Sequence, residues 1–248
     1  MTGISIAIDG PAGTGKSTVA KEVARRLKLA YFDTGATYRV ATLWCMREGV
    51  DLAVESDVAA MVETMNVGLV LDPRNPRVLL EDEDVSSLIR SDAVALTVSK
   101  VATNLEARAA LGHWQREVIA SELDGGYSEG RGIVSEGRDI TTIIAPDADV
   151  RILMTADEEI RVARRAGEGA DLATVREAVL GRDKKDATVV SFHTAADGVH
   201  TLDTSDLTIE EAVQAVLDLI AEVRGDDAAE APAASEAPAA DVADEAGE

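Results

Sequence analysis

The sequence has one cysteine, Cys45, no long apolar run and few basic residues. A single cysteine excludes an intrachain disulfide and a cysteine-rich metal site, which is typical of a reducing compartment. No run approaches the roughly 18 apolar residues that span a bilayer, and residues 1–4 lack the basic segment of a signal peptide. We therefore expect a cytoplasmic protein with no membrane partner.

Basic residues are scarce relative to acidic ones. The chain has 24 Lys and Arg against 46 Asp and Glu, which gives a net charge of −22. General binding to nucleic acid or to an anionic surface is therefore disfavoured. An anionic ligand must be held by a local cluster of cationic side chains. With 248 residues, 46% of them hydrophobic, the chain is long enough to bury the core of one large domain or of a domain with inserts.

The C-terminal segment, residues 225–248, has a composition of its own. It holds ten alanines, two prolines and eight acidic residues, with no Lys or Arg. Such a segment cannot bury enough apolar surface to offset the entropy lost on ordering. We predict a disordered acidic tail, with binding to a partner as the alternative role. Without its eight negative charges, the predicted domain at residues 1–224 carries a net charge of −14.

Short apolar runs alternate with helical periodicity along the chain. The run at residues 4–9 precedes a glycine-rich turn and a helical pattern at 17–29, and similar runs follow at 29–33, 132–135 and 149–155. This alternation predicts an α/β fold with a parallel sheet. The last helix begins with the capping box of Thr208 and Glu211. Its predicted apolar face consists of Ile209, Ala212, Val213, Val216, Leu217 and Ile220.

Two segments interrupt the alternation. Residues 67–71 and 77–80 flank a turn-rich stretch with Pro73 and Pro76, which predicts a hairpin inside an inserted subdomain at about 55–100. The polar stretch at 164–171 contains two glycines and is either a mobile lid or an ordinary loop between helices.

The most specific motif is Gly10-Pro11-Ala12-Gly13-Thr14-Gly15-Lys16-Ser17, a complete G-x-x-x-x-G-K-[ST] between a predicted strand and a predicted helix. Its glycines let backbone N–H groups face a phosphate chain, and the helix that follows adds partial positive charge. Lys16 supplies a charge for the β- and γ-phosphate oxygens, and the Ser17 hydroxyl can ligate Mg²⁺. The motif predicts binding of a nucleoside triphosphate.

Arginines follow two further predicted strands. One cluster contains Thr34, Tyr38 and Arg39, and another contains Arg138 and Asp139. Ligands collect at the carboxyl ends of strands in open α/β sheets, and guanidinium groups bind phosphate oxygens bidentately. A second substrate with a phosphate group is therefore expected. The chain has neither Asn-Lys-x-Asp, which reads guanine in GTPases, nor the Leu-Ser-Gly-Gly-Gln of transport ATPases.

Over residues 4–223 the sequence resembles bacterial cytidylate kinase, a family of CMP and dCMP kinases. Five separated motifs carry the resemblance: Ile8-Asp9-Gly10-Pro11, Asp33-Thr34-Gly35-Ala36 with Tyr38-Arg39, Glu81-Asp82-Glu83-Asp84-Val85-Ser86, Glu136-Gly137-Arg138-Asp139, and Arg182-Asp183-x-x-Asp186. The resemblance implies a three-layer P-loop NTPase fold with a parallel sheet core, an inserted monophosphate-binding subdomain at about 55–100 and a short lid at about 161–187.

The resemblance also implies the roles of single residues. It assigns catalytic roles to Lys16, Arg138 and Arg182. It assigns ATP binding to residues 10–18, from Gly10 to Thr18. CMP binding falls to Thr34, Tyr38, Arg39, Ser99, Arg108, Arg138, Asp139, Arg182 and Asp186. Among these, Ser99, Arg108 and Asp139 correspond to the cytosine readers. A carboxylate accepts a hydrogen bond from the N4 amine of cytosine, whereas uracil presents an acceptor there.

The sequence departs from the family at one position. The family continues Arg-Asp-x-x-Asp-x-x-Arg, and the last position here is Val189. We expect one of Arg161, Arg164, Arg165, Lys184 or Lys185 to compensate.

The expected reaction transfers the γ-phosphoryl group of ATP to CMP or dCMP, with Mg²⁺ as cofactor. The acceptor phosphate is mostly dianionic at neutral pH and needs no general base, which agrees with three histidines that lie outside the motifs. The expected partners are these nucleotides alone, and the expected state is a monomer. The alternatives are a P-loop kinase for UMP, AMP or a non-nucleotide acceptor, and a non-catalytic nucleotide-sensing module.

Overall fold

The computed structural model describes residues 3–166, 171–190, 192 and 194–225, without the side chain of Arg182. The predicted tail lies outside this part of the chain except for Gly225, and so do residues 167–170 of the predicted lid. None of the helices in the described part combines the length and the apolar character that crossing a membrane requires.

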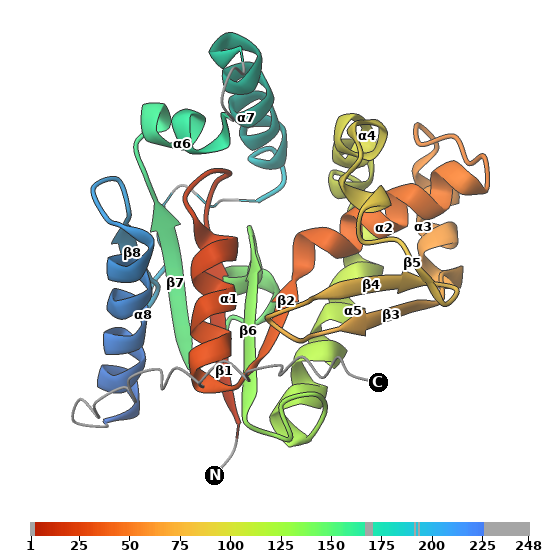
Figure 1. Ribbon diagram of the computed structural model, residues 1–248. Coiled ribbons are helices and arrows are strands. Elements are labelled where there is room, and N and C mark those ends of the chain that lie inside the picture. The colour runs from red at the N-terminus through yellow and green to blue at the C-terminus, as the bar shows by residue number, and fades with distance from the viewer. Residues whose placement is uncertain (1–2, 167–170, 191, 193, 226–248) are drawn as a thin grey trace, which may run out of the picture.

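Five strands form the central sheet in the order β2-β6-β1-β7-β8 (Figure 1). Their bounds are Ala30–Asp33 for β2, Gly132–Gly137 for β6, Ile4–Asp9 for β1, Val150–Thr155 for β7 and His200–Asp203 for β8. All four neighbouring pairs are parallel, as predicted, so the carboxyl ends of the strands meet at one edge. The sequence does not indicate β8, because this edge strand has one large apolar residue, Leu202, between exposed polar ones.

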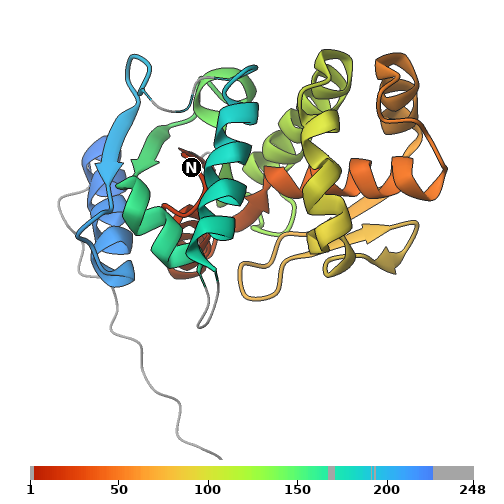
Figure 2. The same cartoon turned by 90° about the horizontal axis from the view of Figure 1, so that it is seen from above.

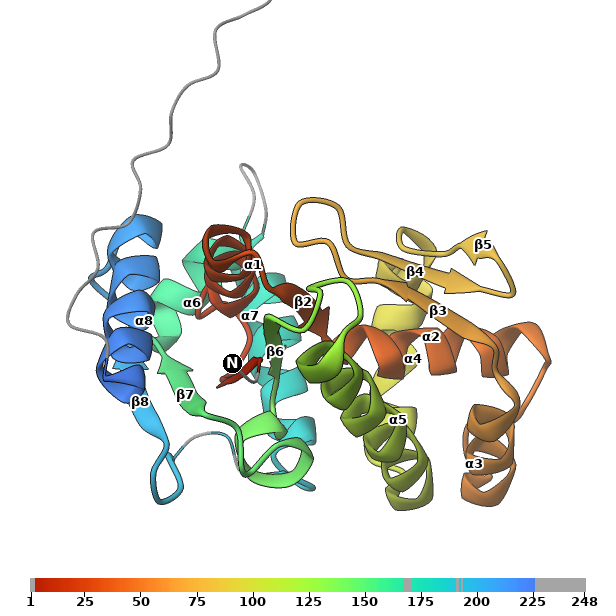
Figure 3. The ribbon, with the colours of Figure 1, turned by 90° about the horizontal axis from the view of Figure 1, so that it is seen from below.

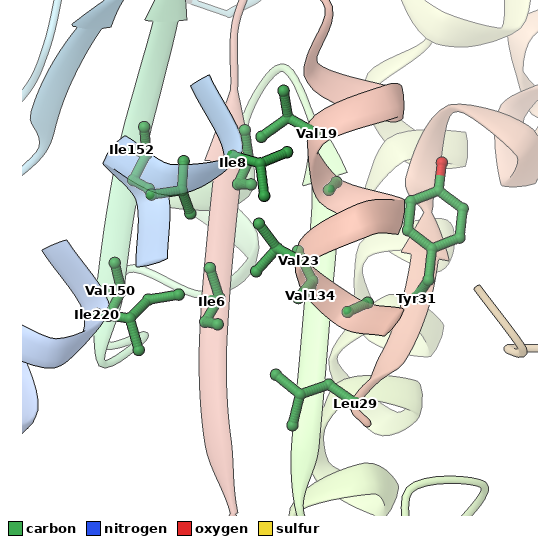
Figure 4. Close-up of a cluster of buried hydrophobic side chains, with 14 of the residues drawn as sticks. Ile6, Ile8, Val19, Val23, Leu29, Tyr31, Val134, Val150, Ile152 and Ile220 are labelled. Carbon is green, nitrogen blue, oxygen red and sulfur yellow. The ribbon is translucent and has the colours of Figure 1, made fainter. Parts of the chain in front are cut away.

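Helices cover both faces of the sheet and give the three predicted layers (Figure 3). One face packs against α1 (Lys16–Leu27) and α8 (Ile209–Arg224), and the other against α5 (Leu105–Asp124) and the π-helical turn η2 (Ile140–Ile144). The alternation along β1 explains this arrangement, because Ile6 and Ile8 face α1 and α8 (Figure 4). Ala7, between them, packs with residues of η2 and α5 on the other face.

Helix α8 begins as predicted. The Thr208 hydroxyl accepts from the Glu211 backbone N–H at 3.2 Å, and the Glu211 carboxylate accepts from the Thr208 N–H at 2.8 Å. The predicted apolar face is buried at Ala212, Val213 and Val216. Ile209 is an exception with 60% exposure, because it opens the helix at the edge of the layer.

An insert lies between β2 and β6. It contains α2 (Thr34–Arg47), α3 (Glu55–Thr64), β3 (Val67–Val70), β4 (Arg77–Leu80), β5 (Glu83–Asp84), the 3-10 turn η1 (Leu88–Arg90) and α4 (Asp92–Ala102). The strands β3, β4 and β5 form an antiparallel sheet, which confirms the predicted hairpin. This small sheet and η1 pack against α2 through their own apolar cluster, which includes Val40, Leu80 and Ile89.

Two further helices lie above the carboxyl edge of the central sheet. They are α6 (Glu158–Arg165) and α7 (Leu172–Asp186), and the view from above shows them over the loop that follows β1 (Figure 2). The insert stands beside them, with α4 facing α7 across the edge. The ends of β2 and β6 line a cavity together with residues of α6, α7 and the insert.

Candidate functional site

The loop between β1 and α1 runs directly into a helix N-terminus. Gly15 is the N-cap residue of α1 with φ of 91°, and no side chain caps the helix. A Cβ atom at Gly15 would have no heavy atom within 4 Å, so the space over the helix end is open. The first turn contains no acidic residue. The backbone N–H groups of a helix N-terminus, the helix dipole and open space suit a phosphate group.

Helix α6 holds the loop from above. Gly13 has φ of +87°, and a Cβ atom there would lie 2.6 Å from the carbonyl oxygen of Arg161, so only glycine fits. The buried Arg161 guanidinium donates to the carbonyl oxygen of Ala12 at 3.0 Å. The loop conformation is therefore fixed by residues about 150 positions away.

A cavity on the outer side of the loop, here called the outer cavity, extends toward α8. It is lined by Gly13, Thr14, Gly15, Lys16, Ser17, Thr18, Val19, Arg90, Arg164, Arg165, Thr204, Leu207, Thr208, Ile209 and Ala212. Arg164 donates to the carbonyl oxygen of Thr204 at 2.6 Å, and the Thr204 hydroxyl donates to the Thr14 carbonyl at 2.9 Å. Six of the nine predicted ATP-binding residues line this cavity, at positions 13–18.

A second cavity, the inner cavity, lies between the loop and the insert. It is lined by Ala12, Lys16, Ser17, Asp33, Thr34, Gly35, Tyr38, Arg39, Arg90, Val98, Ala102, Arg108, Glu136, Gly137, Arg138, Asp139, Arg165, Asp186 and Val190. Seven of the nine predicted CMP-binding residues are among them. Of the other two, Ser99 is half-buried on α4 and does not line the cavity, and the Arg182 side chain lies outside the described structure.

Among the described residues, four line both cavities: Lys16, Ser17, Arg90 and Arg165. The Lys16 ammonium also donates to the carbonyl oxygen of Pro11 at 3.2 Å, which keeps it beside the loop. The two cavities therefore meet at a junction with three cationic side chains. Arg90 has no place in the predicted site, and Arg165 enters the prediction only as a substitute for the family arginine at position 189.

An ion-pair network joins the inner cavity to α7. Arg138 contacts Asp183 at 2.7 Å and Asp186 at 2.8 Å, and Asp183 also pairs with Arg161. Asp183 accepts in addition from the Ala12 N–H at 3.2 Å. Burial alone would raise the pKa of Asp183, but the charge of Arg138 and these hydrogen bonds lower it below its usual value. The network orients Arg138 and ties α7 to the phosphate loop.

Three of the predicted residues form a buried wall of the inner cavity. Arg108 and Asp139 form a salt bridge, with side chains 14% and 6% exposed, and the Arg108 guanidinium lies 5.5 Å from the ring centre of Tyr38. Burial raises the pKa of Asp139 despite the opposing charge of Arg108. This wall presents a planar guanidinium, a carboxylate and an aromatic ring, which are the groups that bind the edge and face of a nucleobase.

Glu136 is a site residue absent from the predicted set, although it belongs to a quoted motif. Its buried carboxylate accepts from the Tyr31 hydroxyl at 2.8 Å and is hydrogen-bonded to Ser17. Burial and the nearby Asp33 carboxylate raise its pKa, and Lys16 opposes this rise. The signal that identifies Glu136 is its position at the carboxyl end of β6, next to β1, where a carboxylate serves the metal in P-loop proteins.

Thr34 and Arg39 complete the inner cavity and also support the backbone around it. The Thr34 hydroxyl donates to the carbonyl oxygen of Glu136 at 2.8 Å, and Arg39 donates to the carbonyl oxygen of Ile89 at 3.2 Å. The first contact ties the start of α2 to β6, and the second ties α2 to η1.

Val189, where the sequence departs from the family pattern, is part of an apolar cluster. Val189 lies against the buried cluster of Leu153, Val190 and Phe192. Of the candidates for compensation, Arg161 is bound to Asp183 and Arg164 to Thr204, while Lys184 and Lys185 are exposed and line neither cavity. Arg165 alone among the five lines both cavities.

The histidines stand apart from the site. His113 and His200 are exposed, and His193 lies outside the described residues. In the described part of the chain, no group of three or more His, Cys, Asp or Glu side chains is placed to hold a metal ion by itself. A metal at the junction would depend on substrate oxygens in addition to protein ligands.

The parallel sheet, the phosphate loop and two adjoining cavities with a cationic junction define a P-loop phosphotransferase. Sequence comparison matches residues 6–222 to the family described as cytidylate kinase. The cytidylate kinase of Streptomyces avermitilis is 40% identical over 224 residues, which cover 89% of this chain and 94% of that protein. The cytidylate kinase of Nocardia farcinica is 41% identical over 229 residues, covering 89% and 95%. The chain belongs to the cytidylate kinase family.

Among solved structures, a shikimate kinase from Bacteroides thetaiotaomicron is 14% identical, with a TM-score of 0.46 over 88% of this chain and 98% of that one. A thymidylate kinase from Candida albicans is also 14% identical, with a TM-score of 0.41 over 91% and 93%.

Proposed function

We propose that this cytidylate kinase phosphorylates CMP and dCMP with ATP by direct, in-line transfer across the junction of its two cavities. The observation that supports this most directly is the junction itself. Lys16, Ser17, Arg90 and Arg165 line both cavities, so two nucleotides bound on either side would meet there with their phosphates facing each other. Such an arrangement replaces an unfavourable encounter in solution with a positioned one.

The outer cavity binds ATP. The loop from Gly10 to Thr18 surrounds the phosphates, to which backbone N–H groups within its cavity-lining part donate, and Lys16 neutralises the β- and γ-phosphate oxygens. The nucleoside extends toward Thr208 and Leu207. None of the described residues that line this cavity is acidic, which favours a polyanionic ligand in a chain whose net charge is −22.

The inner cavity binds the acceptor. Arg39 and Arg138 bind the phosphate of CMP, with Thr34 beside them, and Asp186 and Arg182 serve the sugar and the phosphate. Asp139 accepts from the cytosine amine while Arg108 donates to its ring acceptors, and Ser99 joins them when the insert moves toward the base. The Arg108–Asp139 pair, whose side chains are 14% and 6% exposed, then lies against the one part of CMP that distinguishes it from UMP.

The residues at the junction fit Mg²⁺. This ion prefers oxygen ligands in octahedral geometry and uses few protein ligands together with phosphate oxygens and water. The Ser17 hydroxyl and the Glu136 carboxylate, which are hydrogen-bonded to each other, would hold it. When bound, Mg²⁺ would neutralise part of the charge of the phosphates of ATP.

The chain itself contributes positioning and charge. The acceptor phosphate is mostly dianionic at neutral pH, so its oxygen attacks without a general base. Lys16, Arg138, Arg182 and Arg165 stabilise the charge on the transferring group, with Arg165 in the role of the family arginine that Val189 replaces. The insert at about 55–100 and the lid at about 161–187 close over the substrates and exclude water that would hydrolyse ATP. The enzyme acts as a monomer in the cytoplasm.

The experiment is a coupled assay of ADP formation with CMP, dCMP, UMP, AMP and shikimate as acceptors. We expect the highest kcat/KM with CMP and dCMP. The Lys16→Ala variant should keep its circular dichroism spectrum and lose activity by about a thousandfold or more. A preference for another acceptor would identify a different small-molecule kinase. ATP binding without ADP formation on addition of CMP would identify a nucleotide-sensing module.

A further inference from the structure

Asp9 is a buried carboxylate at the end of the central strand β1. It belongs to the motif Ile8-Asp9-Gly10-Pro11 and directly precedes the phosphate loop. The residue is 2% exposed and lines neither cavity. It therefore has no direct contact with a substrate in the proposed reaction.

The sheet holds the backbone of Asp9 from both sides. Asp9 pairs with Gly137 of β6 and with Leu153 of β7, so it lies in the middle of three parallel strands. Side chains alternate along a strand, and Asp9 is two residues after Ala7, which packs with residues of η2. The Asp9 carboxylate is thus directed toward η2 from a backbone with little freedom to move.

Both carboxylate oxygens of Asp9 bind the start of η2. One accepts from the Ile140 N–H at 3.0 Å. The other accepts from the Thr141 N–H at 2.8 Å and from the Thr141 hydroxyl at 2.6 Å. Backbone N–H groups in the first turn of a helix have no acceptor within that helix. Asp9 therefore caps η2 from a strand that is 131 positions away from Ile140.

Asp139 occupies the position from which an aspartate normally caps a helix. It is the N-cap residue of η2, and an aspartate there typically accepts from an N–H group of the first turn. The Asp139 side chain makes no such hydrogen bond. It pairs with Arg108 and lines the inner cavity. Because Asp9 supplies the cap, the carboxylate of Asp139 is left for the cavity.

We propose that Asp9 is a positioning residue for base recognition, which keeps the Asp139 carboxylate directed at the acceptor base by capping η2 in its place. The inference rests on the proposed function, in which Asp139 accepts from the amine of cytosine. Without the cap, the Thr141 N–H lacks an acceptor and draws the Asp139 carboxylate toward η2, away from Arg108 and the base.

The test is a double-mutant cycle of Asp9→Asn and Asp139→Asn. Asn has nearly the shape of Asp but only one acceptor oxygen, and its NH2 group would face an N–H donor, so half of the cap is lost. The measured quantity is the ratio of kcat/KM for CMP to that for UMP, which does not depend on the folded fraction. The assay is run at pH 8, where Asp9, whose pKa burial raises to about 6, is ionised.

Glu122→Gln is the matched control. Glu122 is also a buried carboxylate, and it accepts from the N–H groups of Tyr127 at 2.9 Å and of Ser128 at 2.8 Å, but it lines neither cavity. Thr141→Val removes only the hydroxyl that donates to Asp9, and Thr141→Ser keeps it. Thermal unfolding verifies that each variant is folded.

We expect Asp9→Asn to lower the preference for CMP about fivefold, which corresponds to the loss of one hydrogen bond. Thr141→Val should lower it by about twofold or more, whereas Thr141→Ser and Glu122→Gln should match the wild type. The double variant should have the ratio of Asp139→Asn alone, because Asp9 acts through Asp139. The KM for ATP should stay within about twofold of the wild type in Asp9→Asn, because the neighbouring strands hold the backbone before the loop.

An unchanged ratio in Asp9→Asn overturns the inference, and if that variant does not fold, an unchanged ratio in Thr141→Val does so. A cycle in which the two effects multiply also overturns it, because Asp9 would then act by another route. An equal loss of preference in Glu122→Gln would show a general effect of removing a buried charge and would overturn it as well.

The wild type and Asp139→Asn separate these failures from a failure of the proposed function. A wild type that forms no ADP with CMP, or that uses UMP equally well, refutes the proposed function. An unchanged ratio in Asp139→Asn refutes the assignment of the base reader, and the inference with it. A wild type that prefers CMP, beside an Asp9→Asn variant with the same preference, refutes only the role of Asp9.

Discussion

The hydroxyl of Tyr31 donates a hydrogen bond of 2.8 Å to Oε1 of Glu136, and both side chains are buried. Tyr31 belongs to β2 and Glu136 to the adjacent β6, so the contact crosses the sheet close to its carboxyl edge. The Tyr31 ring stands beside α1 with its hydroxyl pointing toward that edge (Figure 4), and the Lys21 ammonium lies 5.3 Å from the ring centre. The phenol therefore orients the carboxylate proposed to hold Mg²⁺.

Replacing Tyr31 with Phe should weaken metal binding by about tenfold, because groups that orient a metal ligand contribute that much to affinity. Calorimetric titration of Mg²⁺ into the complex with ADP measures this, and the KM for CMP should not change. Tyr127→Phe is the control, because Tyr127 is 42% exposed and lines neither cavity. An unchanged midpoint for Mg²⁺ in Tyr31→Phe would show that the hydrogen bond has no part in orienting the carboxylate.

Asp139→Asn should reduce the preference for CMP over UMP by about tenfold or more. The carboxylate only accepts hydrogen bonds, whereas the amide of Asn also donates and can satisfy the O4 of uracil. The measured quantity is the ratio of kcat/KM for the two acceptors, which does not depend on the fraction of folded enzyme. Thr188→Ala is the control, because Thr188 is exposed and lines neither cavity. A constant ratio would place base recognition elsewhere.

The buried carboxyl of Asp9 should make the free energy of unfolding depend on pH. Burial raises its pKa to about 6, although the Thr141 hydroxyl and the backbone N–H groups of Thr141 and Ile140 donate to it. The native state therefore retains a proton that the unfolded state loses near pH 4. The contribution of this group to the free energy of unfolding falls as the pH rises from about 4 to 6, by roughly 3 kcal/mol.

Urea unfolding of the wild type and Asp9→Asn at several pH values tests this expectation. Asn does not titrate, and the other acidic groups are common to both proteins, so the difference in unfolding free energy isolates Asp9. The stability of the wild type relative to Asp9→Asn should decrease between pH 4 and pH 6.5. A difference that is independent of pH would contradict the raised pKa.

Removing the capping box of α8 should lower the free energy of unfolding modestly. Thr208→Ala removes the acceptor for the Glu211 N–H, and the expected cost is about 1 kcal/mol in the free energy of unfolding. Thr208→Ser keeps the hydroxyl and should unfold close to the wild type in the same urea titration. Equal stability of Thr208→Ala and Thr208→Ser would mean that the helix end is held by its packing and not by the cap.

Local features of the fold follow directly from the sequence. The apolar runs predict β1, β2, β6 and β7, and the glycine-rich turn after residue 9 predicts the loop that leads into α1, because strands and tight turns depend on residues close in the chain. The edge strand β8 cannot be predicted in this way. It is a strand because it pairs with β7, and not because of its own composition.

The functional site also contains some residues that the sequence identifies and others that only the structure identifies. Lys16, Arg138 and Asp139 carry motif signals, and all three line the inner cavity. Ser99 shares a motif spacing with Arg108, yet it does not line the cavity, whereas Val98 and Ala102 of the same helix do. Arg90 has no motif signal of its own, because its importance comes from the insert that folds back onto the end of β2.

The amino-acid order alone determined the phosphate loop, the parallel α/β arrangement and the family, because each depends on short stretches of residues whose chemistry is readable in place. Tertiary structure decided which residues far apart in the chain come into contact. Tyr31 and Glu136 are 105 positions apart, and Arg161 reaches Ala12 across 149 positions. Such pairs form only when the parallel strands bring their carboxyl ends to one edge, and the strength of each contact then depends on burial that no local pattern records.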